Sequence, residues 1–212
     1  MPDVSSVSED LACAPINPYG ETKLIGEWMT RDAARSWGLR VANLRYFNVA
    51  GTGWNDLADT AVMNLVPIIF EAIRSGKAPK VFGTDYPTPD GSCVRDYVHV
   101  LDLAEAHLSA LAYLDKEQRN FDVFNVGTGH GSSVLEVLAE VKKVSGIDFE
   151  MGLIKNRYIH RTFIRPTTQL RERDLKMKLN PVVETLKGHD DVGALDGAAR
   201  GTGARQRIVD LV

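Results

Sequence analysis

The sequence lacks the features that mark several protein classes. It has two cysteines in 212 residues, Cys13 and Cys93, which is too few for a disulfide framework or a cysteine-rich metal site. No apolar run is long enough to cross a bilayer, and the polar start from Met1 to Leu11 is unlike a signal peptide. We therefore expect a soluble, cytoplasmic protein with no membrane partner.

An excess of positive charge is also missing. The chain has 25 Lys and Arg against 28 Asp and Glu, a formal net charge of -3, which argues against a nucleic-acid partner. The stretch 157–178 is rich in Arg and Lys, but it contains no recognised nucleic-acid-binding module. We interpret it as a solvated segment.

What the sequence does contain is an alternation of strand and helix patterns, which predicts an α/β fold. Asn17 and Pro18 are typical of a helix start, and Ser133 with Glu136 forms a capping box. We predict helices over 17–38, 62–76, 103–111 and 133–146, strands over 39–46, 80–82, 97–100 and 123–126, and loops over 1–16, 48–59 and 84–92.

This alternation stops near Glu150. The following segment has weak periodicity, and from 188 to 203 it is rich in Gly and Ala. We predict a folded region over 1–150 and a divergent tail over 151–212 that packs poorly or remains disordered.

The first candidate for chemistry is the segment PYGETK, in which Tyr19 and Lys23 lie four residues apart and share one helical face. An ammonium group beside a phenol stabilises the phenolate. Tyr19 could then take a proton from a substrate hydroxyl while hydride leaves for a nicotinamide. The spacing alone is common by chance, and an exposed Tyr and Lys without a function is the simpler interpretation of it.

Three further segments follow PYGETK along the chain: LRYFNVAG (44–51), VFGTDYPTPDGSCVRDYVHVLDLAEAH (81–107) and FNVGTG (124–129). Together the four resemble the extended short-chain dehydrogenase/reductase family, and within it the UDP-glucose 4-epimerases. The resemblance covers about residues 1–150. It implies a Rossmann-like doubly wound sheet with a small substrate-binding α/β region, an NAD cofactor, a UDP-sugar substrate, no metal, and a homodimer as one assembly the family allows.

The resemblance also implies roles for individual residues. Tyr19 matches the family's catalytic tyrosine, and Lys23 matches the lysine that holds the nicotinamide ribose. Tyr46 matches a position that contacts NAD, and Phe47 and Asn48 match positions beside the sugar nucleotide. Asn64, Leu65 and Arg95 match contacts with its diphosphate, and Tyr97 lies beside Arg95. Val81 and Phe82 match the uracil pocket.

The chemistry of some of these side chains fits their implied roles, but each has an alternative. Arg95 has the fork geometry that a diphosphate needs, although an ion pair with Asp96 or Asp102 is the commoner fate of an arginine. Phe82 could stack on uracil or pack in the core. Asn48 follows a strand, where α/β proteins bind ligands, or it is a turn residue. Tyr46 and Phe47 could equally be buried strand aromatics.

Two other patterns carry less weight. The segment from Gly127 to Gly131 follows a strand as a phosphate-binding turn does, but Ser132 stands where the motif has its third glycine, and we interpret it as a tight turn. His99 and His107 have no third ligand at a metal-like spacing.

The sequence also departs from the family. No GxGxxG turn occurs in the 212 residues, the family's catalytic Ser or Thr has no counterpart, and KNRYIHRTFIRP (155–166) replaces a run of Arg-Arg-Pro-Gly-Asp. We interpret the chain as N-terminally truncated, with an incomplete sheet, exposed apolar surface and little or no epimerase activity alone. A non-catalytic UDP-sugar-binding remnant, or a sugar-nucleotide 4,6-dehydratase or decarboxylase, remain alternatives.

Overall fold

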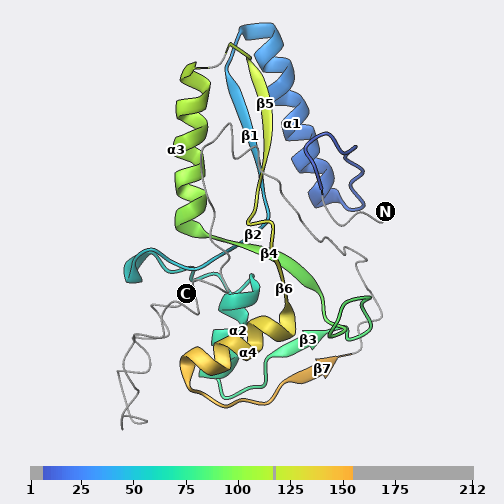
Figure 1. Ribbon diagram of the computed structural model, residues 1–212, viewed down its shortest axis with the longest axis vertical. Coiled ribbons are helices and arrows are strands. Elements are labelled where there is room, and N and C mark those ends of the chain that lie inside the picture. Colours follow the sequence, from blue (N-terminus) through green and yellow to red (C-terminus); the bar gives the residue numbers. More distant parts are fainter. Residues whose placement is uncertain (1–6, 117, 155–212) are drawn as a thin grey trace.

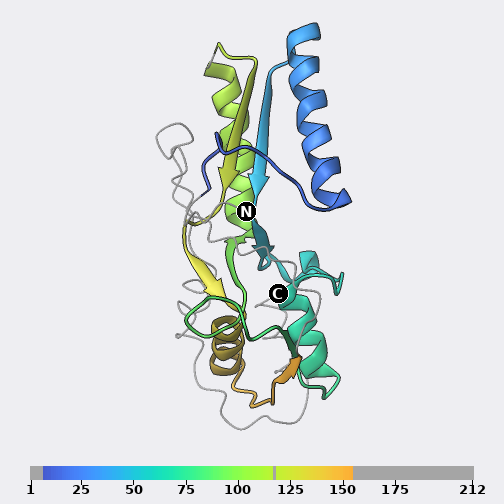
Figure 2. The ribbon, with the colours of Figure 1, turned by 90° about the vertical axis from the view of Figure 1, so that its right-hand side faces the viewer.

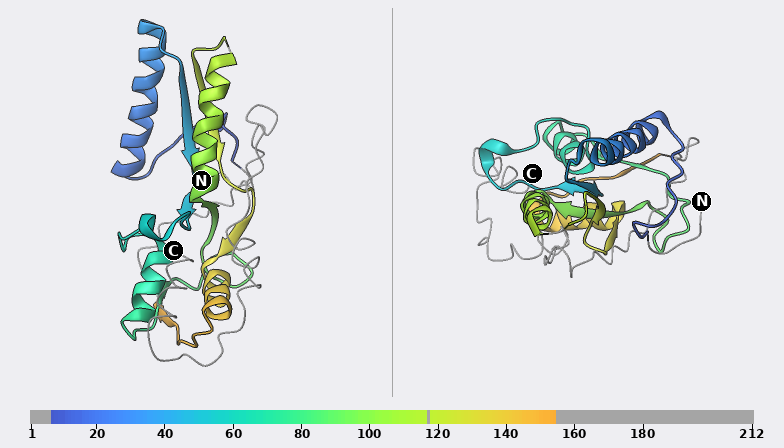
Figure 3. Two further views of the ribbon diagram at one scale, coloured as in Figure 1. Left: turned by 90° about the vertical axis from the view of Figure 1, so that its left-hand side faces the viewer. Right: turned by 90° about the horizontal axis from the view of Figure 1, so that it is seen from above.

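The computed structural model describes residues 7–116 and 118–154, which form an elongated molecule (Figure 1). Its upper part consists of α1 (Pro18–Trp37), β1 (Val41–Tyr46), α3 (Val100–Lys116) and β5 (Phe121–Val126). The strands β1 and β5 pair in parallel. Seen from above, α1 and α3 lie on opposite faces of this strand pair (Figure 3). The layering confirms the predicted α/β class.

The lower part contains the other elements. The three-residue strands β2 (Asn48–Ala50) and β6 (Gly131–Ser133) flank β4 (Val94–His99), β2 in parallel and β6 antiparallel. A second parallel pair joins β3 (Lys80–Phe82) to β7 (Gly152–Ile154). The helices α2 (Leu65–Arg74) and α4 (Val134–Ser145) and the short helix η1 (Asn55–Leu57) complete it. Figure 2 shows how β2, β4 and β6 carry the chain between the two parts.

Local capping explains where the helices begin and end. The Asn17 side chain accepts a hydrogen bond from the Gly20 amide at 2.8 Å at the start of α1, and Gly38 ends that helix with a left-handed φ of 68°. The predicted capping box of Ser133 and Glu136 starts α4. These ends were predicted correctly because each depends on neighbouring residues.

Several short elements differ from the prediction. Residues 48–50 form a strand where a loop was expected, and 131–133 form β6 directly after the expected turn. Helix α2 begins at Leu65 rather than near residue 62, and β4 is longer than the predicted 97–100. The three-residue strands exist through pairing with β4, which a local sequence pattern cannot reveal.

The predicted boundary at residue 150 needs one correction. Residues 152–154 form β7, which pairs with β3 over its whole length, so the packed region continues past Glu150. The rest of the predicted tail lies outside the described residues.

One large and two smaller sets of apolar side chains form the core. The larger lies between α2, α4 and β3 and includes Ile69, Phe70, Val81 and Leu138. The smaller sets lie between α3 and the strands β1 and β5, around Leu103, Val126, Tyr113 and Phe124. The face of β1 toward α1 carries no comparable cluster among the described residues.

Helix α1 leaves much of its apolar stripe uncovered. Leu24 is half-buried, but Ile25, Trp28 and Met29 are exposed. This agrees with the expected exposure of apolar surface, because the strand pair beneath α1 is narrow. Within the described ranges, no helix is both long and apolar enough to cross a membrane.

Candidate active site

Helix α1 brings Tyr19 and Lys23 together, as their spacing predicted. The Lys23 Nζ atom lies 5.2 Å from the centre of the Tyr19 ring. The cap at Asn17 and the proline at 18 fix the first turn, so Tyr19 is the second residue of a well-defined helix. Tyr19 is 72% exposed, which leaves its hydroxyl accessible to a ligand.

Tyr19 and Lys23 border an open hollow of about 650 Å³ between α1 and β1. Its floor is made by residues 43–46 of β1, and Cys13, Ala14 and Pro15 form part of its rim. The chain of β1 runs toward the end of α1 that carries Tyr19 (Figure 1). The Tyr19–Lys23 pair therefore lies near the carboxyl end of a parallel strand, where α/β sheets bind ligands.

An ion pair holds α1 to β1 at the base of this hollow. The Arg45 guanidinium donates from Nε to Glu27 Oε2 at 2.8 Å and from Nη2 to Glu27 Oε1 at 2.6 Å. One turn further along α1, the side chains of Thr30 and Asn43 share a hydrogen bond of 3.0 Å. Strand alternation explains the pattern, because Asn43 and Arg45 point to the same face of β1.

Arg45 also contacts the segment that precedes α1. Its Nη1 donates to the backbone carbonyl of Glu9 at 3.2 Å, and the Glu9 carboxylate accepts from the amide of Asn125 in β5 at 2.9 Å. The hydrogen bonds to Glu27 are the largest of the effects that raise the pKa of Arg45 above its ordinary value, and burial opposes them. Arg45 thus stays charged.

The last residue of β1 and the two residues after it have different surroundings. Tyr46 lines the hollow, yet its ring lies 6.5 Å from that of His107 on α3, and the residue is 54% exposed. The alternative of a buried strand aromatic is therefore wrong for Tyr46. Phe47 packs against Gly127, where an added Cβ would fall 2.5 Å from its ring. Asn48 is an exposed residue of β2 and not a turn residue.

Asn64 and Leu65 lie at the start of α2. Asn64 is exposed, and its amide donates to Asp59 Oδ2 at 3.1 Å. Leu65 packs against the larger core cluster and is only partly buried. The Asn64 amide is thus accessible to a ligand, whereas Leu65 has mainly a packing role.

The two residues predicted at a uracil pocket differ in accessibility. Val81 is 1% exposed and belongs to the core, so its side chain cannot reach a ligand. Phe82 is 53% exposed, which excludes simple core packing and leaves part of the side chain accessible for stacking.

Arg95 lies on β4, where its positive charge affects the pKa values of neighbouring side chains. The guanidinium Nη1 donates to the Val94 carbonyl at 2.9 Å. Burial raises the pKa of Cys93 and of Tyr97, and the positive charge of Arg95 partly offsets both increases. Tyr97 itself is buried, so it supports this region from within the fold.

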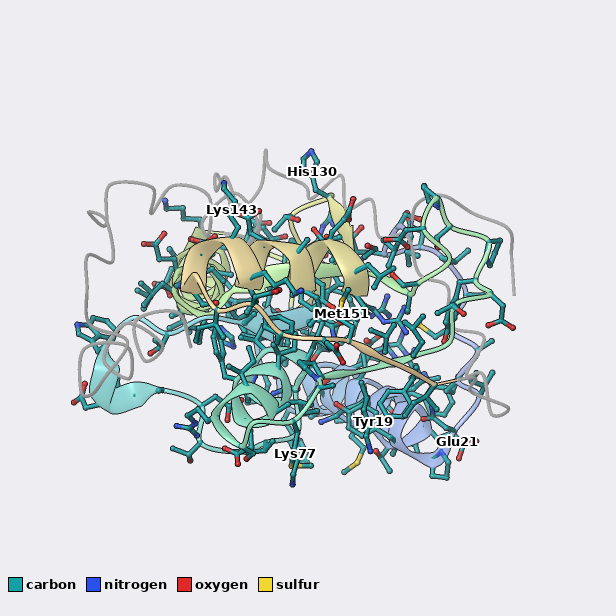
Figure 4. The ribbon with its side chains drawn as sticks, turned by 90° about the horizontal axis from the view of Figure 1, so that it is seen from below. Tyr19, Glu21, Lys77, His130, Lys143 and Met151 are labelled. Carbon is teal, nitrogen blue, oxygen red and sulfur yellow. The ribbon has the colours of Figure 1, made fainter. Side chains whose placement is uncertain are left out.

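Asp96, which lies between Arg95 and Tyr97 on β4, binds the glycine-rich segment after β5. Its carboxylate accepts from the Thr128 amide at 3.0 Å, the Thr128 hydroxyl at 2.8 Å and the Gly129 amide at 2.9 Å. The amides of Thr128 and Gly129 are therefore bound by a carboxylate of the protein itself. Residues 127–130 form a bend between β5 and β6, with a positive φ of 76° at Gly129. His130 lies on the opposite side of the molecule from Tyr19 (Figure 4).

The histidines show local contacts. His99 Nδ1 accepts from the Leu101 amide at 3.2 Å, and His107 Nδ1 lies 2.8 Å from the Leu103 carbonyl. Across residues 7–116 and 118–154, no group of three or more His, Cys, Asp or Glu side chains is arranged to hold a metal ion.

The structure thus joins some predicted residues and separates others. Tyr19, Lys23 and Tyr46 line one hollow, and Asn48, Phe82 and Arg95 are not part of its lining. Glu27 and Arg45 were not predicted, and Asp96 was considered only as an ion-pair partner of Arg95. Glu27 could have been found, because it continues the four-residue spacing of Tyr19 and Lys23, whereas the partners of the other two are distant in sequence.

Comparison with known proteins adds a family to this geometry. A model of the NAD dependent epimerase/dehydratase family matches residues 1–127. The UDP-glucose 4-epimerase of Azospirillum brasilense is 44% identical over 149 residues, which cover 68% of this chain and 42% of that protein. The UDP-glucose 4-epimerase of Lactobacillus helveticus is 44% identical over 161 residues, or 72% of this chain and 48% of the relative.

Solved structures give the same result at the level of the fold. The crystal structure of UDP-glucose-4-epimerase from Stenotrophomonas maltophila, with bound NAD and formylated UDP-arabinopyranose, superposes with a TM-score of 0.78 at 34% identity. The match covers 87% of this chain and 56% of that one. The chain therefore spans about half the length of the relatives it matches.

Proposed function

The chain belongs to the NAD dependent epimerase/dehydratase family, and from that membership we propose that it carries the catalytic tyrosine and part of the substrate site of a UDP-glucose 4-epimerase. The main supporting observation is the Tyr19–Lys23 pair, whose side chains meet at 5.2 Å beside a hollow at the carboxyl end of β1. The similarity to UDP-glucose 4-epimerases at 44% identity favours this activity over the dehydratase and decarboxylase alternatives.

The proposed chemistry is a reversible proton transfer at the sugar 4-hydroxyl. The Tyr19 oxygen takes that proton while hydride leaves C4, and it returns the proton when hydride comes back to the opposite face of the 4-keto sugar. Lys23 Nζ lies 5.2 Å from the centre of the Tyr19 ring, and in the proposed chemistry its charge would attract the negative charge that develops on the phenol during the transfer. NAD, when bound, supplies the reversible hydride acceptor.

The residues around the hollow fit one end of NAD. Lys23 is an exposed donor beside Tyr19, and the hollow of about 650 Å³ next to both is wide enough for a nicotinamide and its ribose. The turn whose amides would hold the pyrophosphate does not occur in the 212 residues. We therefore propose that the chain holds the nicotinamide end and contributes little to binding the rest.

For the UDP group we propose the exposed ring of Phe82 as the uracil contact and Arg95 as the diphosphate contact. Phe82 lies on β3 and Arg95 on β4. Asn48 and Asn64 are exposed polar groups suited to the sugar and the diphosphate. Val81 and Tyr97 are buried, so they support this surface from below.

A non-catalytic UDP-sugar-binding protein is the second candidate function. Such a protein would bind a UDP-sugar at the exposed Phe82 ring and Arg95 without turnover. Both proposals share the Phe82 and Arg95 surface and differ only at the cofactor.

Calorimetric titrations with UDP-glucose and with NAD test these proposals together. We expect UDP-glucose to bind and NAD to bind weakly. Binding of both at micromolar concentrations would support a working enzyme, and binding of UDP-glucose alone would support the non-catalytic protein. A folded chain that binds neither ligand would contradict both.

Three further attributes belong to the same proposal. Conversion of UDP-galactose to UDP-glucose would place the protein in galactose metabolism. Cys13 and Cys93 are both free thiols, which suits the cytoplasm. The exposed side chains of Ile25, Trp28 and Met29 on α1 form an apolar surface suited to a homodimer, which sedimentation velocity would test.

A further inference from the structure

Arg45 joins three parts of the fold, and no step of the proposed chemistry uses it. It lies on β1, both oxygens of Glu27 on α1 accept from its guanidinium, and the carbonyl of Glu9 accepts a third bond. These bonds tie the strand, the helix and the segment before the helix to one side chain. A planar guanidinium can do this because its donors diverge in a fixed fork.

Glu27 lies in the same row of α1 as Tyr19 and Lys23. The three residues follow at intervals of four, and all three line the hollow. A helix rises about 1.5 Å per residue, so Glu27 is about 12 Å along the axis from Tyr19. Because a capped helix of this length is stiff, fixing its rotation at Glu27 also fixes the direction in which Tyr19 and Lys23 point.

The ion pair is well placed to fix that rotation. The side chains of Arg45 and Glu27 are 27% and 18% exposed, so water competes for them less than for a surface pair. Among the described residues no side chain of α1 belongs to a core cluster, and Ile25, Trp28 and Met29 are exposed. The polar bonds of Arg45 and of Asn43 with Thr30 therefore carry much of the attachment.

We propose that the Arg45–Glu27 ion pair is a positioning device that holds the face of α1 bearing Tyr19 and Lys23 in register with β1. Arg45 and Glu27 are positioning residues here, since neither has to touch the reacting atoms. The functional part of this inference rests on the proposed function, and the attachment of α1 to β1 can be tested without it.

The test compares Arg45→Met and Arg45→Lys with the wild-type chain. Arg74→Met is the matched control, because Arg74 forms an exposed ion pair with Glu71 on α2. Hydrogen exchange followed by mass spectrometry measures opening of α1 and, as an internal reference, of α4. Ligand-observed NMR measures the binding of two ligands, UDP and nicotinamide mononucleotide. The second carries only the end of NAD that is proposed to bind near Tyr19 and Lys23.

We expect amide exchange in residues 18–30 to rise about tenfold in Arg45→Met, with exchange in α4 and binding of UDP unchanged. Nicotinamide mononucleotide should bind about tenfold more weakly in the same variant. Arg45→Lys should give an intermediate result, because one ammonium keeps the charge but cannot bridge both Glu27 oxygens. Arg74→Met should match the wild type.

Two results would contradict different parts of the proposal. Unchanged exchange in α1 of Arg45→Met, or an equal rise in α4, would overturn the positioning role. A wild-type chain that does not bind nicotinamide mononucleotide would contradict the proposed function, and α1 exchange would still decide whether the ion pair holds the helix.

Discussion

At the scale of single residues, the candidate site combines groups whose accessibility matches their proposed roles with others that only support them. Tyr19, Phe82 and Asn64 are exposed, whereas Val81 and Tyr97 are buried. Sequence resemblance gave all five a contact role. For Val81 and Phe82 the reason for the difference is that alternate residues of a strand face opposite sides, so Phe82 is exposed while Val81 packs in the core.

Replacement of Arg95 tests the proposed diphosphate contact. A guanidinium that holds a diphosphate through charged hydrogen bonds contributes about 1.5–3 kcal/mol each, so Arg95→Met should weaken UDP binding at least about tenfold. Arg95→Lys should recover part of the loss because the charge remains. Calorimetry with UDP measures both, with Arg74→Met as the control, and unchanged affinity in Arg95→Met would remove Arg95 from the site.

Asp96 gives the chain a predictable pH dependence. Burial raises its pKa above the ordinary 3.8 and outweighs the hydrogen bonds from Thr128 and Gly129, which lower it. The folded chain therefore keeps a proton at a pH where the unfolded chain has lost it. Stability due to this group falls as pH rises from about 3.8 through the folded-state pKa.

Asp96→Asn should remove this titration and flatten the pH profile of the free energy of unfolding just above about pH 4. At neutral pH the variant should lose about 1–3 kcal/mol, because one amide oxygen cannot accept the bonds now made to two carboxylate oxygens. Urea unfolding at several pH values measures both effects. An unchanged slope in the variant would assign the titration to another group.

At the scale of the elements, helix ends were readable from the sequence and short strands were not. Asn17, Gly38 and the Ser133–Glu136 box act on neighbouring amides and carbonyls, so their effect is local. The strands β2 and β6 each have three residues and depend on β4 for their partners. Their formation is decided by contacts across the fold, which a local pattern does not record.

Gly26 within α1 and Gly38, which ends it, should respond to replacement by alanine in opposite directions. Gly26 lies within the helix with nothing within 4 Å of an added Cβ, and Gly38 has a left-handed φ of 68°. Gly26→Ala should therefore stabilise the chain by about 0.5–1 kcal/mol, and Gly38→Ala should destabilise it by about 1 kcal/mol. Thermal or urea unfolding of the two variants measures this, and a shared sign would contradict the assigned end of α1.

The capping box of α4 has a second function as an attachment for the loop before β4. The Ser133 hydroxyl accepts from the Glu136 amide at 3.0 Å and donates to the Asp90 carboxylate, which also accepts from Ser92. We expect Ser133→Ala to cost about 1–2 kcal/mol of unfolding free energy. Ser109→Ala, within α3, is the control and should cost nothing. Equal effects of both would show that the cap does not stabilise α4.

At the scale of the whole molecule, the α/β class, the parallel pairing and the family follow from the order of four sequence segments. The arrangement of the strands in separate groups of two, three and two could not be read from that order. The Arg45–Glu27 and Asp96–Thr128 contacts could not be predicted from the sequence either, because each joins residues far apart in the chain. The sequence therefore predicts which residue types form the site, and tertiary contacts decide which of them meet.

The most direct test of the central claim is the turnover of a chimera in which the part of the Azospirillum brasilense enzyme that precedes the matched region is fused to Met1. The measurement is kcat for conversion of UDP-galactose to UDP-glucose, for the chimera and for its Tyr19→Phe variant, after UDP binding shows that both are folded. We predict activity in the chimera and a loss of about 100-fold or more in the variant, because the phenol oxygen carries the proton. A folded, UDP-binding chimera that is inactive, or equally active without that oxygen, would contradict the claim that Tyr19 is the catalytic residue.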